Sequence, residues 1–301
     1  MNRWIKRGLL AICVLFVLLI LTVFGAVQYG NTKMARRLDI AARPVALRDD
    51  AASIERGRYL YESRACTDCH ALNGGGRTVI DDGKGMRVAG PNISPGPGNV
   101  VAHYKPEDWE RSIRHGVKPD GRPALIMPSE DYNRLTDDDL AALVAYLRHM
   151  PPASGGGAVL ELPVPVRALY GLGVIKDAAE KIDHSLLPQQ PVVEGVNLAH
   201  GEYVANMCKG CHGDGFSGGK IPGAPPDWPA AANITPEEGS AMTHYADAEQ
   251  FLAMFRSGKR PDGTAISMVM PFEALAKASD TDVRALYLYL RSVAPRPAGG
   301  R

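Results

Sequence analysis

The sequence predicts an all-α protein in which one N-terminal transmembrane helix precedes two similar helical domains in tandem. Three observations predict this: a long apolar run near the N-terminus, a pentapeptide that occurs twice, and ordered matches between the two halves of the chain. A length of 301 residues favours about two domains. With 22% charged residues and a net charge of +1, no nucleic-acid partner is expected.

A membrane anchor is predicted for residues 1–30. The stretch from Leu9 to Val27 is apolar apart from Thr22, and as a helix it would span about 28 Å, close to the thickness of the hydrocarbon core. The preceding residues carry basic side chains and no acid: Arg3, Lys6 and Arg7. This flank predicts a single-pass protein of a bacterial inner membrane, with its N-terminus in the cytoplasm and the rest in the periplasm.

A cleaved signal peptide is the alternative to this anchor. Its apolar region should be shorter and should end at a small-x-small cleavage site, which residues 23–25 (Val-Phe-Gly) match only weakly. Cys13 lies inside the apolar run and is expected to pack there as a small hydrophobic residue. Residues 31–50 follow as a polar, arginine-containing tether.

The repeated pentapeptide predicts covalent haem attachment. It reads Cys-Thr-Asp-Cys-His at residues 66–70 and Cys-Lys-Gly-Cys-His at residues 208–212. Two thiols on one turn can each form a thioether to a haem vinyl group, and the adjacent histidine is then the proximal ligand of the iron. Two covalently bound haem c groups are therefore expected. The attachment residues are Cys66, Cys69, Cys208 and Cys211, and the proximal ligands are His70 and His212.

Zinc binding or a redox dithiol would use part of the same motif. A zinc site requires four protein ligands and each pentapeptide supplies three, whereas a redox Cys-x-x-Cys does not require the adjacent histidine. Because the full motif occurs twice, haem attachment is the favoured interpretation.

Short helices are expected around each motif. In the first half, residues 54–65 lead into the motif, residues 106–114 place Trp109 and Ile113 on one face, and a helix begins at Thr136 with a capping box. Consecutive prolines end that last helix at residue 151. The first domain is accordingly predicted over residues 51–150.

An internal duplication relates the two halves. Matched residues recur in order at a shift of 141 to 143 positions: Cys66/Cys208, His70/His212, Asn92/Asn233, His103/His244, Trp109/Phe251, Pro119/Pro261, Met127/Met270 and Tyr146/Tyr289. The second domain is therefore predicted over residues 197–295, with a linker at 151–196 that contains a helix at 168–181, and a tail at 296–301.

The repeat also selects the second axial ligand of each iron. A Met-Pro pair follows each motif histidine, and its methionines, Met127 and Met270, are the predicted distal ligands. Met268 is a competitor for the second iron. His103 and His244 are in register and are the bis-histidine alternative, but we expect them to be loop residues at the haem edge.

Two further expectations concern the loops beside the motifs. Each proximal histidine should donate its other ring N–H to a backbone carbonyl, with Pro91 as the candidate in the first domain. Asn92 and Asn233 match the glycosylation pattern, but their repetition favours a structural loop.

Each half resembles a class I cytochrome c domain, and residues 51–295 are similar to the cytochrome c subunits of membrane-bound periplasmic alcohol and gluconate dehydrogenases. The features that carry this resemblance are Asn92-Ile-Ser-Pro95, Trp109, Arg114-His-Gly116, Asp120-Gly121, Met127-Pro128 and the helix start at 135–140. Those subunits typically have three haem motifs, whereas this sequence has two and adds an N-terminal anchor.

The expected function is electron transfer, without a catalytic residue, between a periplasmic dehydrogenase or quinol-oxidising complex and a downstream acceptor. The sequence leaves both redox partners open. The alternative is a dihaem enzyme such as a peroxidase, which would require one iron with an open position and an acid–base group above it. Two matched Met-Pro pairs argue against that alternative.

Overall fold

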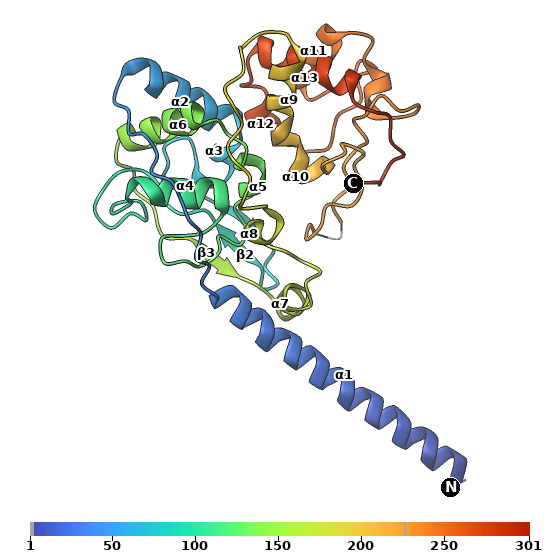
Figure 1. Ribbon diagram of the computed structural model, residues 1–301. Helices are drawn as coiled ribbons and strands as arrows, with labels where there is room; N and C mark the ends of the chain where they lie inside the picture. Colours follow the sequence, from blue (N-terminus) through green and yellow to red (C-terminus); the bar gives the residue numbers. More distant parts are fainter. Residues whose placement is uncertain (1–2, 226) are drawn as a thin grey trace.

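The computed structural model describes residues 3–225 and 227–301, so residues 1–2 of the predicted anchor and residue 226 of the predicted second domain lie outside the description. A long helix, α1 (Arg3–Ala35), projects from two compact helical bodies that lie side by side (Figure 1). Among the described residues, α1 is the helix that is long and apolar enough to cross a membrane.

The first body contains the three helices that the sequence predicts, which are α2 (Ala51–Ser63), α4 (Pro106–His115) and α6 (Asp137–His149). Two short helices that were not predicted join them, namely α3 (Cys66–His70) at the motif and α5 (Ser129–Tyr132). Helix α6 begins at the expected residue, since the Thr136 hydroxyl accepts a hydrogen bond from the Asp139 N–H at 3.1 Å. The predicted capping box is not completed, because the Thr136 N–H donates to the Tyr203 hydroxyl at 3.3 Å instead of to Asp139. Helix α2 starts three residues before the predicted position because Asp50 caps it.

The second body repeats this order. Its elements are α9 (Leu198–Ala205), η1 (Asn206–Cys208), α10 (Lys209–His212), η2 (Ala241–His244), α11 (Ala248–Ser257), α12 (Phe272–Leu275) and α13 (Asp280–Ser292). Each body has its own hydrophobic cluster, in which the first long helix packs on the last.

The first and last helices of each body cross at a glycine. A Cβ atom on Gly57 of α2 would lie 1.9 Å from the Ala142 carbonyl oxygen of α6, and one on Gly201 would lie 2.1 Å from the Ala285 carbonyl oxygen. No larger residue fits so close an approach of two backbones. Gly57 and Gly201 are therefore the residues at which the first and last helices of each body pack together.

A small sheet departs from the all-α expectation. Strands β1 (Thr78–Asp81), β2 (Arg87–Ala89) and β3 (Val159–Glu161) form an antiparallel sheet in that order. The strands are three or four residues long, which is too short for an alternating pattern to be recognised in the sequence. Strand β3 also belongs to the linker, far from the other two strands in the sequence. The linker helix expected at 168–181 is two helices, α7 (Val164–Gly171) and α8 (Ala178–Lys181), interrupted by Gly173 at φ +75°.

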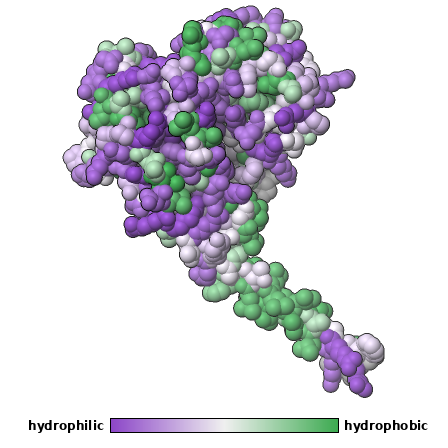
Figure 2. Space-filling model, viewed as in Figure 1, coloured by the Kyte–Doolittle hydropathy of each residue, from purple (hydrophilic) through white to green (hydrophobic). Residues whose placement is uncertain are grey.

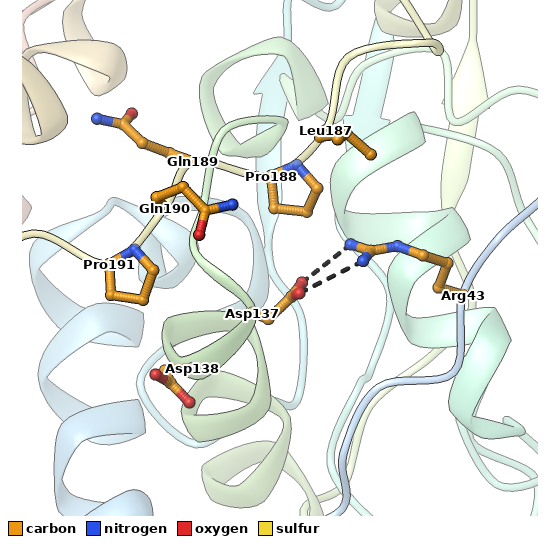
Figure 3. A pocket seen from close by; sticks show the side chains of 8 residues that line it. All are labelled: Arg43, Asp137, Asp138, Leu187, Pro188, Gln189, Gln190 and Pro191. Carbon is orange, nitrogen blue, oxygen red and sulfur yellow. Dashed lines mark hydrogen bonds and ion pairs between the residues drawn. The ribbon is translucent and has the colours of Figure 1, made fainter.

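The segment predicted as a tether is part of the structure around it. Its first five residues continue α1, and the rest lies along the first body, where the Leu38 N–H donates to the Gly121 carbonyl at 2.8 Å and Val45 is buried. Arg43 points at Asp137 across a surface pocket of about 170 Å³ that residues 187–191 of the linker close on the other side (Figure 3). This pocket contains none of the predicted haem residues.

The two bodies are joined through a buried carboxylate of α13. Asp282 accepts hydrogen bonds from Tyr59 at 2.6 Å and Arg64 at 2.8 Å, both in the first body, and from His200 Nε2 at 2.8 Å within its own body. The Tyr59 oxygen in turn accepts from the Ser279 N–H at 2.9 Å. Burial alone would raise the pKa of Asp282, but the hydrogen bond from His200 and the charge of Arg64 outweigh it and hold that pKa well below its ordinary value.

The reciprocal contact occurs on the other side of the repeat. Tyr203 of the second body donates to Asp139 of α6 at 2.6 Å, and Arg56 pairs with the same carboxylate at 2.8 Å. Because Asp139 and Asp282 occupy equivalent positions in the two bodies, as do Tyr59 and Tyr203, the interface is pseudo-symmetric. Each body therefore supplies a tyrosine that donates a hydrogen bond to the buried carboxylate of the other body.

Replacing Asp282 with asparagine should destabilise the folded chain. The variant leaves Arg64 as a buried cation without its counter-ion, so the free energy of unfolding should fall by about 3 kcal/mol. Asp280→Asn is the matched control, because Asp280 lies two residues away on the same helix and is exposed. Urea unfolding of the purified protein measures both; equal midpoints for the two variants would contradict this account of the interface.

Candidate haem sites

The first Cys-x-x-Cys-His motif forms the short helix α3. Ala65 enters it at φ 61°, and the His70 carbonyl accepts from the Gly76 N–H at 3.0 Å, which turns the chain sharply after the motif. His70 Nδ1 lies 3.0 Å from the Pro91 carbonyl oxygen, the acceptor that the sequence suggested. This contact places the proton on Nδ1 and leaves Nε2 as the free nitrogen.

The second motif has the same geometry. The Gly218 N–H donates to the His212 carbonyl at 2.9 Å, and His212 Nδ1 lies 2.8 Å from the Ala232 carbonyl oxygen. Ala232 aligns with Pro91, and the acceptor is a backbone atom in both, so the difference in side chain has no consequence. Burial lowers the pKa of both histidines, which favours the neutral imidazole that binds metal ions.

An asparagine fixes the loop that supplies each carbonyl. Asn92 follows Pro91 and donates from Nδ2 to the Ala153 carbonyl at 2.7 Å; Asn233 follows Ala232 and donates to the Arg296 carbonyl at 2.7 Å. Both side chains are buried, at 1% and 7% exposure. The expectation of a structural loop is confirmed, and the glycosylation interpretation is wrong for these two buried amides.

The predicted distal methionines occupy equivalent places. Met127 is partly buried against the first hydrophobic cluster and precedes α5, and Met270 is partly buried against the second cluster and precedes α12. Met268 is 87% exposed, so it does not compete with Met270 for a position inside the domain. His103 and His244 are both exposed.

The residues present in each domain fit a covalently attached haem. The first motif thiol and the Met-Pro methionine lie at the edge of the same hydrophobic cluster, Cys66 with Met127 in the first domain and Cys208 with Met270 in the second. All four motif thiols are free of disulfides. Thiols, an oriented neutral imidazole and a thioether are the donor set of a haem c with histidine and methionine ligation.

Sequence reasoning missed a contact between the first domain and the second motif. Asp131 of α5 accepts from the Gly210 N–H at 2.9 Å, and a Cβ atom on Gly210 would lie 2.7 Å from the Asp131 carboxylate oxygens. Burial raises the pKa of Asp131 to about 7, and the charge of Glu130 acts in the same direction. Asp131 lies only four residues after Met127, and no local pattern in the sequence links it to Gly210.

Comparison with known proteins assigns a family to each domain. Residues 52–147 match the family described as cytochrome c oxidase, cbb3-type, subunit III, and residues 199–294 match the family described as cytochrome c. The protein therefore contains two cytochrome c domains behind an N-terminal apolar helix. Such domains imply two covalently bound haem c groups, which makes the chain an electron-transfer protein.

Three curated relatives resemble the chain across both domains. The fructose dehydrogenase cytochrome subunit of Gluconobacter japonicus is 28% identical over 83% of this chain and 54% of its own length. The alcohol dehydrogenase (quinone) cytochrome c subunit of Gluconobacter oxydans (strain 621H) is 25% identical over 83% and 56%. The gluconate 2-dehydrogenase cytochrome c subunit of Pantoea cypripedii is 26% identical over 84% and 63%. The chain thus spans between about half and two thirds of each relative.

The pKa of Asp131 predicts a pH-dependent stability. Its pKa is raised in the folded state, so the native protein binds more protons than the unfolded chain between about pH 4, the usual value, and about pH 7. The contribution of Asp131 to stability is therefore full below this window and falls as pH rises through it.

Asp131→Asn should abolish the part of this fall that Asp131 causes. Glu130→Gln is the comparison variant: it removes the smaller cause of the raised pKa and leaves burial and the contact with Gly210 in place, so most of the fall should remain. Urea midpoints measured from pH 4 to pH 8 report the slope. An unchanged slope in Asp131→Asn would show that the carboxyl group is not the titrating group.

Proposed function

We propose that this chain is the membrane-anchored cytochrome c subunit of a periplasmic dehydrogenase, passing electrons from the dehydrogenase to a downstream acceptor. The observation that carries the proposal is the similarity across both domains to cytochrome subunits of three dehydrogenases. Those enzymes are named for different substrates, namely fructose, an alcohol and gluconate. What they share is the cytochrome subunit, so the similarity supports the electron-transfer role and not one substrate.

Each haem is assigned to one domain. Cys66 and Cys69 attach the first haem and Cys208 and Cys211 attach the second, and the ligand pairs are His70 with Met127 and His212 with Met270. The haem supplies one-electron redox chemistry at each site. Support comes from the matched hydrogen bonds of the two histidines and from the partial burial of the two methionines at equivalent cluster edges.

The proposed histidine and methionine ligands support electron transfer at both haems and argue against an iron that binds a substrate. If Met127 and Met270 supply a thioether to each iron in addition to the motif histidine, they would raise the reduction potential and leave no position free for a small molecule. His103, in a turn, and His244, at the end of η2, are both exposed at the surface. The chain is therefore proposed to hold and orient its haems and to exclude other ligands from both irons.

The N-terminal helix α1 is proposed to anchor the chain with its domains in the periplasm. Its apolar run and its basic N-terminal flank support this orientation. The helix is continuous from the apolar run into residues that pack on the linker, which favours an uncleaved anchor. The domain boundaries at 51–150 and 197–295 are part of this proposal, and the matched family ranges of 52–147 and 199–294 support them.

A membrane assay tests this function. Detergent extracts of native membranes should yield the chain together with a dehydrogenase, and adding that enzyme's substrate should reduce both haems of the chain. Membranes from a strain without the chain should retain dehydrogenase activity with an artificial acceptor but lose electron delivery to quinone or oxygen. Full electron delivery in the absence of the chain would contradict the proposal.

The distal ligand assignment is tested by a pair of variants in the second domain. Met270→Ala should lower the potential of one haem, remove the weak sulfur-to-iron band of the oxidised protein and let carbon monoxide bind, because the iron loses its neutral thioether ligand. Met268→Ala should do none of these, because its side chain is exposed. Spectroelectrochemical titration measures both, and a native spectrum in Met270→Ala would refute the assignment.

A further inference from the structure

The linker helix α7 packs directly on the end of the anchor helix α1. A Cβ atom on Gly171 would lie 2.0 Å from the Ala26 carbonyl oxygen, and one on Gly30 would lie 2.4 Å from the Arg167 carbonyl oxygen. The two helices therefore touch backbone to backbone. Ala26 lies within the apolar run of α1, so the contact begins at the depth where the run ends.

Ion pairs fix this arrangement on the side of the domains. Lys33 of α1 bonds the Tyr170 carbonyl at 3.1 Å and pairs with Glu180 of α8 at 2.9 Å. Arg36 pairs with the buried carboxylate of Asp177 at 2.8 Å. Because Lys33 and Asp177 are almost inaccessible to solvent, the end of α1 is held rigidly against α7 and α8.

Beside this contact, the linker exposes apolar side chains. Pro165, Leu169 and Leu172 are spaced by four and three residues and so share one face of α7 and its last turn. Leu172 and Val174 are each 60% exposed. Figure 1 shows α7 at the edge of the first body where α1 leaves it, and Figure 2 shows the hydrophobic surface of α1 extending toward that edge.

We propose that α7 and the turn at 172–174 lie in the membrane interface, with their exposed apolar side chains embedded in the lipid bilayer surface. If the apolar run of α1 occupies the hydrocarbon core, the backbone contact between Ala26 and Gly171 places Gly171 at the boundary of that core. Leu172, the next residue, then lies at the same level. The exposed cations Arg37 and Lys176 come directly after these segments, where lipid phosphates would lie.

This second contact would hold the haem domains at a fixed height and orientation over the membrane. A single membrane helix permits the attached domains to tilt relative to the membrane. A second segment that is packed on this helix and also contacts the membrane would restrict that tilt. The inference rests on the proposed membrane anchor, so the experiment must report on α1 and α7 separately.

Site-directed spin labelling of the full-length haem-loaded protein in phosphatidylethanolamine and phosphatidylglycerol vesicles makes this test. In a Cys13→Ser background, nitroxides are placed with Leu172→Cys on the turn, Leu18→Cys in the anchor and Val193→Cys as a control. Val193 is 84% exposed and lies shortly before α9, which Figure 1 draws well away from α1. Collision with oxygen, which concentrates in lipid, is compared with collision with a water-soluble nickel chelate.

The label at 172 should collide with oxygen more than with nickel, as the label at 18 does, and the label at 193 should show the opposite preference. The visible haem spectra of the three labelled variants, recorded in detergent-free buffer after excess vesicles are removed, should match the spectrum of the parent protein. This match shows that the substitutions leave the haem sites intact. If the label at 172 behaves like the one at 193 while the label at 18 is protected, the anchor stands and the inference is overturned. If the label at 18 also contacts nickel, the proposed anchor itself is wrong.

Discussion

The hydrogen bond between each motif histidine and a backbone carbonyl is the constraint on which both domains depend. It joins the motif helix to a loop about 20 residues downstream: His70 to Pro91 and His212 to Ala232. The asparagine after each acceptor then ties that loop to the chain that leaves the last helix. That last helix crosses the first one at a glycine, so the imidazole is oriented by the whole domain and not by its own turn.

Duplication of this domain created a second level of constraint. The bodies exchange tyrosines, so that Tyr59 reaches Asp282 and Tyr203 reaches Asp139. Asp131 adds a contact from the first domain to the backbone of the second motif. A carrier with two haems requires a fixed distance between them, because electron transfer depends steeply on separation, and buried charged contacts suit that requirement better than a flexible linker.

Many features of the fold and of the haem sites could be predicted from the sequence. Those that could not all depend on contacts between segments that are far apart in the chain. The motifs, the Met-Pro pairs and the capped helix at Thr136 are local patterns, and the repeat allowed each to be checked against a second copy. The sheet that includes β3, the packing of residues 36–50 and the contact of Asp131 with Gly210 depend on segments far apart in the sequence. The hydrogen bonds of Tyr59 and Tyr203 to carboxylates of the other domain likewise have no local signal in the sequence.

The central claim is that each domain holds its own covalently attached haem. Intact mass measurement of the mature protein tests it most directly, with Cys66→Ala/Cys69→Ala and Cys208→Ala/Cys211→Ala variants alongside. The account predicts a mass increment of two haem groups for the parent chain and one for each double variant. A parent chain that carries one haem or none, or a double variant that still carries two, would contradict it.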